Sequence, residues 1–196
     1  MTRTVTANIT LSLDGRVNGA GGEFDMSWIV PHAITEAARD HMVAMAERST
    51  TILLGRKNYQ GFGGFWPPVA DDENAAPQDR VASRWMTATE KIVFSSTLTE
   101  PTWANSRIVD AEPADVVKQL RGEEGGEIVV LSSVSVIKAL LAADEVDRLA
   151  IVLAPELVGA GDRLFEDGLP ASSWTLTAST TAETGALCLI YDRVRS

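Results

Sequence analysis

The chain has 196 residues, of which 45% are hydrophobic and 22% are charged, and its formal net charge is −10 at pH 7. This composition is typical of a globular protein, and the length suits one domain covering 1–196. The negative charge argues against nucleic acid or an anionic membrane surface as a partner, because both attract basic faces.

Cys188 is the only cysteine, which excludes an internal disulfide and a thiolate metal cluster, and we expect no metal site. The first residues lack the apolar run of a secretory signal, and no stretch approaches the roughly 20 apolar residues of a membrane span. These features together predict a cytoplasmic protein.

The chain begins with a predicted strand, Val5–Leu13, which ends at an Asp-Gly turn. The glycine-rich segment Arg16–Met26 follows, and we expect it to be a loop. From Pro31 onward a single amphipathic helix is predicted, because apolar residues recur at helical spacing through Ile34–Met45.

The middle of the chain is less regular. Short apolar runs predict buried strands at Thr50–Leu54 and Lys91–Phe94. Between them, the aromatic and glycine-rich Phe62–Pro68 and the acidic Asp71–Asp79 are expected to form an irregular excursion. A helix is predicted over Glu112–Arg121, with a proline in its first turn and a glycine beyond its end.

The last third contains the clearest unit, which is strand Glu127–Leu131, helix Ser132–Ala143 and strand Arg148–Ala154. Such a crossover predicts parallel strands. Thr175–Ser179 and Ala186–Tyr191 flank a turn and are expected to pair antiparallel. The sequence therefore predicts an α/β fold with a mostly parallel sheet and an antiparallel C-terminal edge.

Ligands of open α/β sheets bind beyond the carboxyl ends of the strands. Here these ends carry Asp14-Gly15, Gly55-Arg56-Lys57, Ser95-Ser96 and Ser132-Ser133. Hydroxyls and cations beside small residues are what a phosphate group requires. We therefore expect these turns to converge on one anionic ligand.

Each of these signals has a simpler explanation when it is taken alone. Arg56 could be a solvated arginine, the serine pairs could be helix caps and the Asp-Gly pair could be a turn. His32 and His41 are expected to be surface and helix-face residues, because no acidic partner sits at ligand spacing. The five tryptophans are expected to line the core or a pocket wall.

The ordered set of motifs resembles a known family. Ile9–Gly15, Met26–Pro31, Leu53–Tyr59, Lys91–Ser95 and Ala154–Gly161 are similar to successive segments of the dihydrofolate-reductase-like superfamily. In particular, they resemble the reductase domain of the bifunctional riboflavin-biosynthesis deaminase/reductase. The resemblance covers nearly the whole chain and implies that fold, with helices on both faces of the sheet.

The resemblance also implies an NADPH site. Arg56, with Lys57 and Asn58, would face the adenosine 2′-phosphate, and the pyrophosphate would lie at the start of a helix. The cofactor-binding residues implied in this way are Thr10, Gly15, Gly55, Arg56, Lys57, Asn58, Ser95, Ser96, Ser132, Ser133, Val134 and Ser135. Trp28 and Ile29 would contact the substrate.

Two positions depart from the family pattern. Ser132-Ser133 stands where the family usually has two glycines, and the helix carboxylate of dihydrofolate reductases falls at about Ala33. Reduction of dihydrofolate itself is therefore not expected. The proton donor stays open between Asp14, Glu36 and a bound water.

These observations predict an NADPH-dependent oxidoreductase that transfers a hydride to a small heterocyclic or carbonyl substrate. The nearest named activity is that of 5-amino-6-(5-phosphoribosylamino)uracil reductase in riboflavin biosynthesis. The alternative is a non-catalytic ligand-binding or assembly protein that kept the fold. A homodimer is expected, paired through the apolar surface around Leu149–Leu153 or through the last strands.

Overall fold

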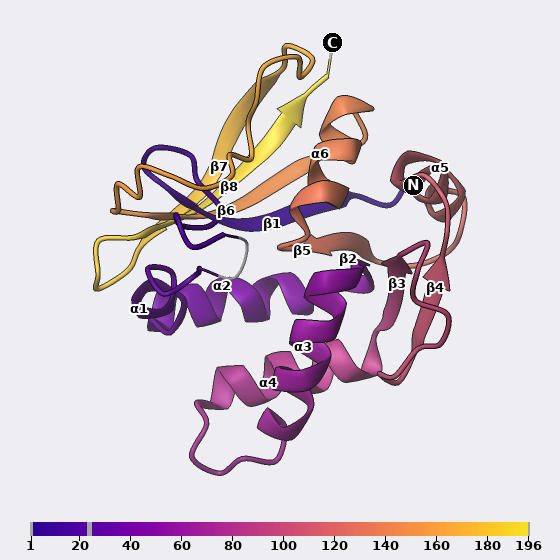
Figure 1. Ribbon diagram of the computed structural model, residues 1–196, viewed down its shortest axis with the longest axis horizontal. Helices are drawn as coiled ribbons and strands as arrows, with labels where there is room; N and C mark the ends of the chain where they lie inside the picture. The colour runs from indigo at the N-terminus through magenta and orange to yellow at the C-terminus, as the bar shows by residue number, and fades with distance from the viewer. Residues whose placement is uncertain (1, 23–24, 196) are drawn as a thin grey trace.

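The computed structural model describes residues 2–22 and 25–195, which form one eight-stranded sheet with helices on both faces (Figure 1). The strands are β1 (Val5–Ser12), β2 (Ser49–Gly55), β3 (Glu90–Phe94), β4 (Ser106–Val109), β5 (Glu127–Leu131), β6 (Arg148–Ala154), β7 (Ser173–Thr181) and β8 (Leu187–Val194). The helices are α1 (Val30–Ala33), α2 (Glu36–Ala46), α3 (Arg56–Val69), α4 (Pro77–Ala88), α5 (Pro113–Arg121) and α6 (Val134–Ala142).

The strand order across the sheet is β4-β3-β2-β5-β1-β6-β8-β7. The pairs from β4 to β6 are parallel, and the pairs β6–β8 and β8–β7 are antiparallel. This confirms the predicted α/β fold with an antiparallel C-terminal edge. The unit β5–α6–β6 is also present, although β1 lies between its two strands and pairs with both.

The central strands are buried on both faces because their alternate side chains enter two different cores. Leu53 of β2 and Val130 of β5 pack in a core with α5 and α6. Leu54 and Val129, from the same two strands, pack in a second core with α2, α3 and α4. Short runs of aliphatic residues without polar alternation therefore form strands here.

The helix that was expected to run unbroken from Pro31 is divided into α1 and α2. Thr35 is extended between them, and its hydroxyl accepts a hydrogen bond from the Ala38 backbone N–H at 3.2 Å. Ile34, which belongs to the predicted apolar stripe, is 54% exposed at the break. The prediction of one helix is wrong because a local N-cap competes with helix continuation.

The expectation of an irregular excursion between Phe62 and Asp79 is confirmed only for 70–76, which joins α3 to α4 without regular structure. It is wrong for Phe62–Pro68, which belongs to α3, and the end of the segment belongs to α4; the two helices pack on each other and on the sheet. Tyr59, Ala82 and Met86 are buried there against β2 and β3. Tertiary burial thus stabilises α3 in a glycine- and proline-rich sequence whose local helical propensity is low.

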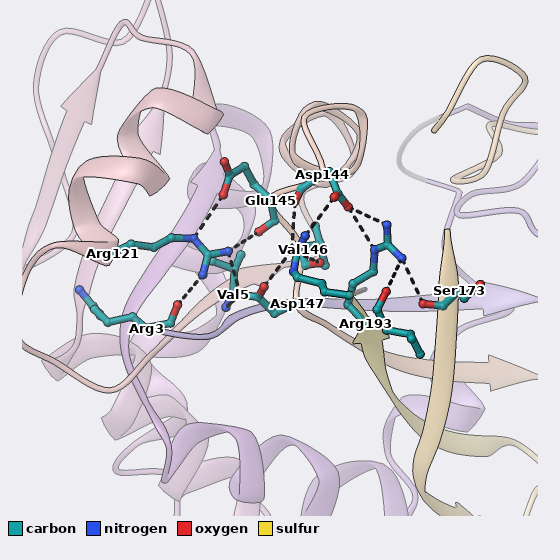
Figure 2. Close-up of polar contacts among 11 residues, drawn as sticks. Arg3, Val5, Arg121, Asp144, Glu145, Val146, Asp147, Ser173 and Arg193 are labelled. Atoms are coloured by element: carbon teal, nitrogen blue, oxygen red, sulfur yellow. Dashed lines mark hydrogen bonds and ion pairs between the residues drawn. The ribbon is translucent and has the colours of Figure 1, made fainter. Parts of the chain in front are cut away.

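A network of ion pairs closes the amino-terminal rim of the sheet (Figure 2). The Arg121 guanidinium donates to the Arg3 carbonyl oxygen at 2.8 Å and pairs with Asp147 at 2.8 Å. The Asp147 carboxylate also accepts the Val5 backbone N–H at 2.9 Å, and Arg193 pairs with Asp144 at 3.0 Å. Helix α5 and strands β1, β6 and β8 are thereby fixed at one rim, opposite the rim where ligands are expected.

One further expectation changes with the fold. The segment Leu149–Leu153 lies in β6, an interior strand between β1 and β8, and its aliphatic side chains are mostly buried. It therefore offers no free surface for a dimer. Within residues 2–22 and 25–195, no helix combines the length and the apolar character needed to cross a membrane.

The two histidines differ in their surroundings. His32 was expected at the surface but is buried, with its ring nitrogens 2.9 Å from the Thr184 hydroxyl and 3.2 Å from the Glu156 carboxylate. It joins α1 to the β7–β8 turn and to the segment after β6. His41 lies on α2 as expected, and burial lowers its pKa to about 4.

Candidate cofactor site

A cavity of about 790 Å³ opens at the carboxyl ends of the parallel strands. This volume lies within the ~300–1,000 Å³ of ordinary small-molecule sites. The described residues that line it are Val17, Asn18, Met26, Gly55, Arg56, Lys57, Asn58, Gly61, Phe62, Phe94, Ser95, Ser96, Thr97, Ser132, Val134, Ser135, Lys138 and Asp162. Three of the four turns expected to converge contribute residues to this one cavity, and the fourth, Asp14-Gly15, lies outside its lining.

The strand order arranges these residues along a line. The lining follows β3, then β2, then β5 with α6, then β1 and finally the segment after β6. Neighbouring strands lie ~4.8 Å apart, so the four intervals span roughly 19 Å. A cavity of this length suits an extended, two-part ligand better than a single ring.

Two helix N-termini face this cavity. Helix α3 begins at Arg56 directly after Gly55, and α6 begins at Val134 directly after Ser133. Neither N-cap residue makes a side-chain capping hydrogen bond. Free N–H groups and the positive ends of two helix dipoles therefore favour an anion in the cavity.

Basic side chains add to this potential. Arg56 and Lys57 lie in the first turn of α3, and Lys138 lies one turn into α6, on the same side of that helix as Ser135. The Lys138 ammonium pairs with Glu166 at 2.8 Å. Among the described lining residues, the only carboxylate is that of Asp162. The cavity is thus locally positive in a protein of net charge −10.

The serine pair after β5 has two different roles. Ser132 lines the cavity and has a φ of 49°, in the left-handed region where glycine is usual. Ser133 does not line the cavity and is 1% exposed. Its hydroxyl accepts the Gly55 N–H at 2.9 Å and donates to the Leu131 carbonyl at 3.0 Å, which fixes the two helix N-termini relative to each other.

The opposite end of the cavity is held by a reciprocal pair. The buried Asn18 amide donates to the Asp162 carboxylate at 2.9 Å, and the Asp162 backbone N–H donates to the Asn18 side-chain oxygen at 2.5 Å. Gly161 has a φ of 95°, and a Cβ there would lie 2.2 Å from the Asn18 carbonyl oxygen. Only glycine permits this close approach of the two loops.

Asp14 does not suit the role of proton donor. Its carboxylate accepts hydrogen bonds from the Ser12 hydroxyl at 2.7 Å and from the backbone N–H groups of Val158 at 3.1 Å and Gly159 at 2.9 Å. These bonds, that from Ser12 above all, hold the pKa of Asp14 well below its usual range. The carboxylate is therefore ionised and ties two loops together, outside the cavity lining.

Five other expected residues also lie outside the lining. Glu36 is exposed at the first position of α2, and Thr10 is half-buried in β1. Trp28 and Ile29 are half-buried before α1, and the Trp28 indole Nε1 is buried with no hydrogen-bond partner among the described residues. Gly15 follows Asp14 in the tied loop, also outside the lining. Their roles stay predictions.

The structure adds lining residues that the sequence did not suggest. Lys138 could have been found, because it follows Ser135 by three positions on a predicted helix. Asn18 and Asp162 gave no such signal, because they are far apart in the sequence and neither lies in a recognisable motif. Phe62 was assigned to the irregular excursion, yet it lines the cavity from α3.

The chain matches the family model of the RibD C-terminal domain over residues 3–188. It belongs to this family. The riboflavin-type resemblance inferred from the motifs is thereby confirmed.

Solved structures share the fold at low sequence identity. A Shewanella sp. PV-4 protein named for riboflavin biosynthesis is 22% identical, with a TM-score of 0.73 and full coverage of both chains. Dihydrofolate reductase of Enterococcus faecalis in complex with NADP(H) is 16% identical, with a TM-score of 0.60 and full coverage of both chains. The dihydrofolate-reductase-like fold is therefore confirmed for this RibD C-terminal domain.

Two other relatives show how the domain occurs. The Thermotoga maritima deaminase/reductase has a TM-score of 0.67 and 13% identity, and the match covers 98% of this chain but 57% of that one. YyaP of Bacillus subtilis (strain 168), an uncharacterised protein, is 22% identical over 193 residues, which are 96% of this chain and 94% of YyaP. The similarity thus extends over nearly the whole of YyaP but over little more than half of the Thermotoga protein.

Proposed function

We propose that this RibD C-terminal domain is an NADPH-dependent oxidoreductase that transfers a hydride to a small heterocyclic or carbonyl substrate. The observation that supports it best is the meeting of two uncapped helix N-termini with Arg56, Lys57 and Lys138 in one cavity. The roughly 19 Å spanned by its strand ends matches a dinucleotide that carries several phosphates.

The residues fit the cofactor in the order of the strands. Arg56, Lys57 and Asn58, with Ser95 and Ser96, would bind the adenosine 2′-phosphate, since a guanidinium can bind phosphate oxygens in a bidentate manner. The N–H groups at the start of α6 would bind the pyrophosphate, assisted by Ser132, Ser135 and Lys138.

The nicotinamide would then lie at the end formed by β1 and the segment after β6, near Thr10 and Asn18. When bound, NADPH supplies the hydride, and the protein fixes its distance and angle to the substrate and excludes water. The Asn18–Asp162 pair keeps this end of the cavity in shape.

Substrate would enter beside the nicotinamide, where Trp28 and Ile29 are the assigned contacts. A pyrimidine like that of 5-amino-6-(5-phosphoribosylamino)uracil is the nearest named substrate. With Asp14 committed to backbone hydrogen bonds, Glu36 or a bound water is left to supply the proton.

Titration of the purified protein with NADPH and NADH, followed by cofactor fluorescence, tests the cofactor assignment. Arg56→Ala should weaken NADPH binding by about 10–100-fold, the equivalent of one charge-assisted hydrogen bond, and leave NADH binding unchanged. Arg107→Ala, which removes an exposed arginine on β4, is the matched control. Absence of NADPH binding at high micromolar concentration would refute the proposal.

The second candidate function is non-catalytic ligand binding. The observation that favours it is Ser132 in a left-handed conformation beside the pyrophosphate position, where a glycine would leave more room. Following NADPH consumption with a panel of pterins, flavins and pyrimidines separates the two. Tight NADPH binding without consumption of any of them would favour the binding protein.

A further inference from the structure

The charged groups that line the cofactor cavity are divided between its two ends. Arg56 and Lys57 lie at the end of β2 with the N-terminus of α3, and Lys138 lies on α6, which begins after β5. Asp162 lies in the segment after β6, and it is the only carboxylate among the described lining residues. The cavity therefore has a positive part over β2 and β5 and a single acidic group at the end formed by β1 and β6.

Asp162 is fixed at three points by the loop after β1. Its carbonyl oxygen accepts the Val17 N–H at 2.9 Å, and its own N–H donates to the Asn18 side-chain oxygen. The Asn18 amide nitrogen donates to the carboxylate oxygen Oδ2 at 2.9 Å, and Asn18 is 3% exposed. The other carboxylate oxygen, Oδ1, has no hydrogen-bond partner among the described residues and is left for a ligand.

The basic residues near Asp162 do not pair with its carboxylate. The Arg16 guanidinium donates to the carbonyl oxygen of the neighbouring Gly161, but its ion pair, at 3.4 Å, is with Asp14. Arg163 is exposed and forms no ion pair with any residue that the structure describes. The charge of Asp162 is therefore not compensated by an ion pair within the described part of the chain.

We propose that the Asp162 carboxylate stabilises the positive charge that hydride transfer leaves on the nicotinamide ring, and that it thereby favours NADP⁺ over NADPH at this site. This role rests on the proposed function, which puts the nicotinamide beside Asn18. Hydride transfer moves two electrons and one hydrogen from the reduced ring to the substrate, so the ring changes from neutral to a charge of +1, and the substrate then takes a proton from Glu36 or water. A carboxylate held beside the ring attracts this charge as it develops.

The charges of the cavity complement those of NADP⁺ from one end to the other. The phosphates are negative and would lie over the positive part of the cavity, whereas the oxidised nicotinamide is positive and would lie at the Asp162 end. The reduced nicotinamide is neutral and gains nothing from this carboxylate. Because the hydrogen bonds to Asn18 already hold the carboxylate in place, no rearrangement is needed when the charge appears.

Calorimetric titration with NADP⁺ and with NADPH tests this role without a substrate. Asp162→Asn removes the charge but keeps the shape, and its amide oxygen can still accept the Asn18 N–H. We expect the dissociation constant of NADP⁺, divided by that of NADPH, to rise about tenfold in this variant, the order expected for one charge–charge interaction in a partly hydrated site. Asp162→Ser removes the same charge with a smaller side chain and should change the ratio in the same direction.

Glu166→Gln is the matched control, because it removes the same charge from the same segment. Glu166 pairs with Lys138 near the pyrophosphate position, which both forms of the cofactor share, so its loss should shift both dissociation constants by one factor and leave their ratio unchanged. Asp162→Glu retains the charge and should keep the ratio within about threefold of the wild type. An unchanged ratio in Asp162→Asn, or equal weakening of both forms, would overturn the role of Asp162 while the cofactor assignment stands. Failure of the wild type to bind either form would refute both.

Discussion

The Ser133 hydroxyl lies behind the cavity wall and connects the segments at which α3 and α6 begin. It accepts the Gly55 N–H and donates to the Leu131 carbonyl, and the residue is 1% exposed. Ser133→Ala removes both bonds and leaves a backbone N–H without its partner. A buried donor left unsatisfied costs ~1–3 kcal/mol, so we expect the free energy of unfolding to fall by about 2 kcal/mol.

For a domain of this size each kcal/mol corresponds to roughly 2–4 °C, which predicts a melting temperature lower by about 4–8 °C. Urea denaturation followed by tryptophan fluorescence measures the change, with the same dependence on urea in both proteins. Ser135→Ala is the matched control, because Ser135 is exposed at the start of the same helix and should cost less than about 0.5 kcal/mol.

Loss of this bond should also weaken NADPH binding, since it fixes the starts of α3 and α6 relative to each other. Two results would show that the Ser133 hydroxyl does not stabilise the site: a Ser133→Ala variant that unfolds at the same urea concentration as the wild type, or a Ser135→Ala variant that loses as much free energy of unfolding as Ser133→Ala.

Three further predictions concern other charged residues. Lys138→Met should weaken the binding of NADPH and of NADH equally, by about tenfold, because both cofactors contain the pyrophosphate. Glu166→Gln should tighten the binding of both, because it frees the Lys138 ammonium from its ion pair. A fluorescence titration in which only NADPH binding changed would contradict this. Asp14→Asn should lower the free energy of unfolding more at pH 7 than at pH 2. The folded pKa lies well below the unfolded value of about 3.9, so the stabilisation is complete above about pH 5, shrinks as the pH falls and disappears only below the folded pKa. Urea melts at both pH values check this, and an equal loss at both would count against it. Arg121→Met should lower the free energy of unfolding by about 2–3 kcal/mol without changing cofactor binding, because it breaks the network in Figure 2. Lys118→Met, on the exposed side of the same helix, should have little effect on stability. Equal melting temperatures for the two variants would show that the network contributes little to stability.

Local sequence patterns were sufficient for five of the six strands of the parallel part of the sheet, while the short β4 was not predicted. Aliphatic runs such as Leu53-Leu54 and Val129-Val130 bury side chains on both faces of the sheet, so an uninterrupted aliphatic run is itself enough to predict a buried strand. Turn residues after each strand likewise indicated where a ligand should bind, because the carboxyl ends of parallel strands share one rim. Nine of the twelve expected cofactor residues line the cavity, and the other three, Thr10, Gly15 and Ser133, do not.

Contacts between distant segments decided the rest. Helix α3 forms in a sequence of low helical propensity because it packs on the sheet through the buried Tyr59. Asp14 was predicted as a candidate proton donor, but in the fold its carboxylate accepts two backbone N–H groups of the loop after β6. Ser133 was predicted to bind the cofactor, but its hydroxyl accepts the Gly55 N–H. A residue type and its neighbours along the chain determine what a side chain can donate or accept, but only the folded structure determines which partner it meets, because those partners are brought together by packing.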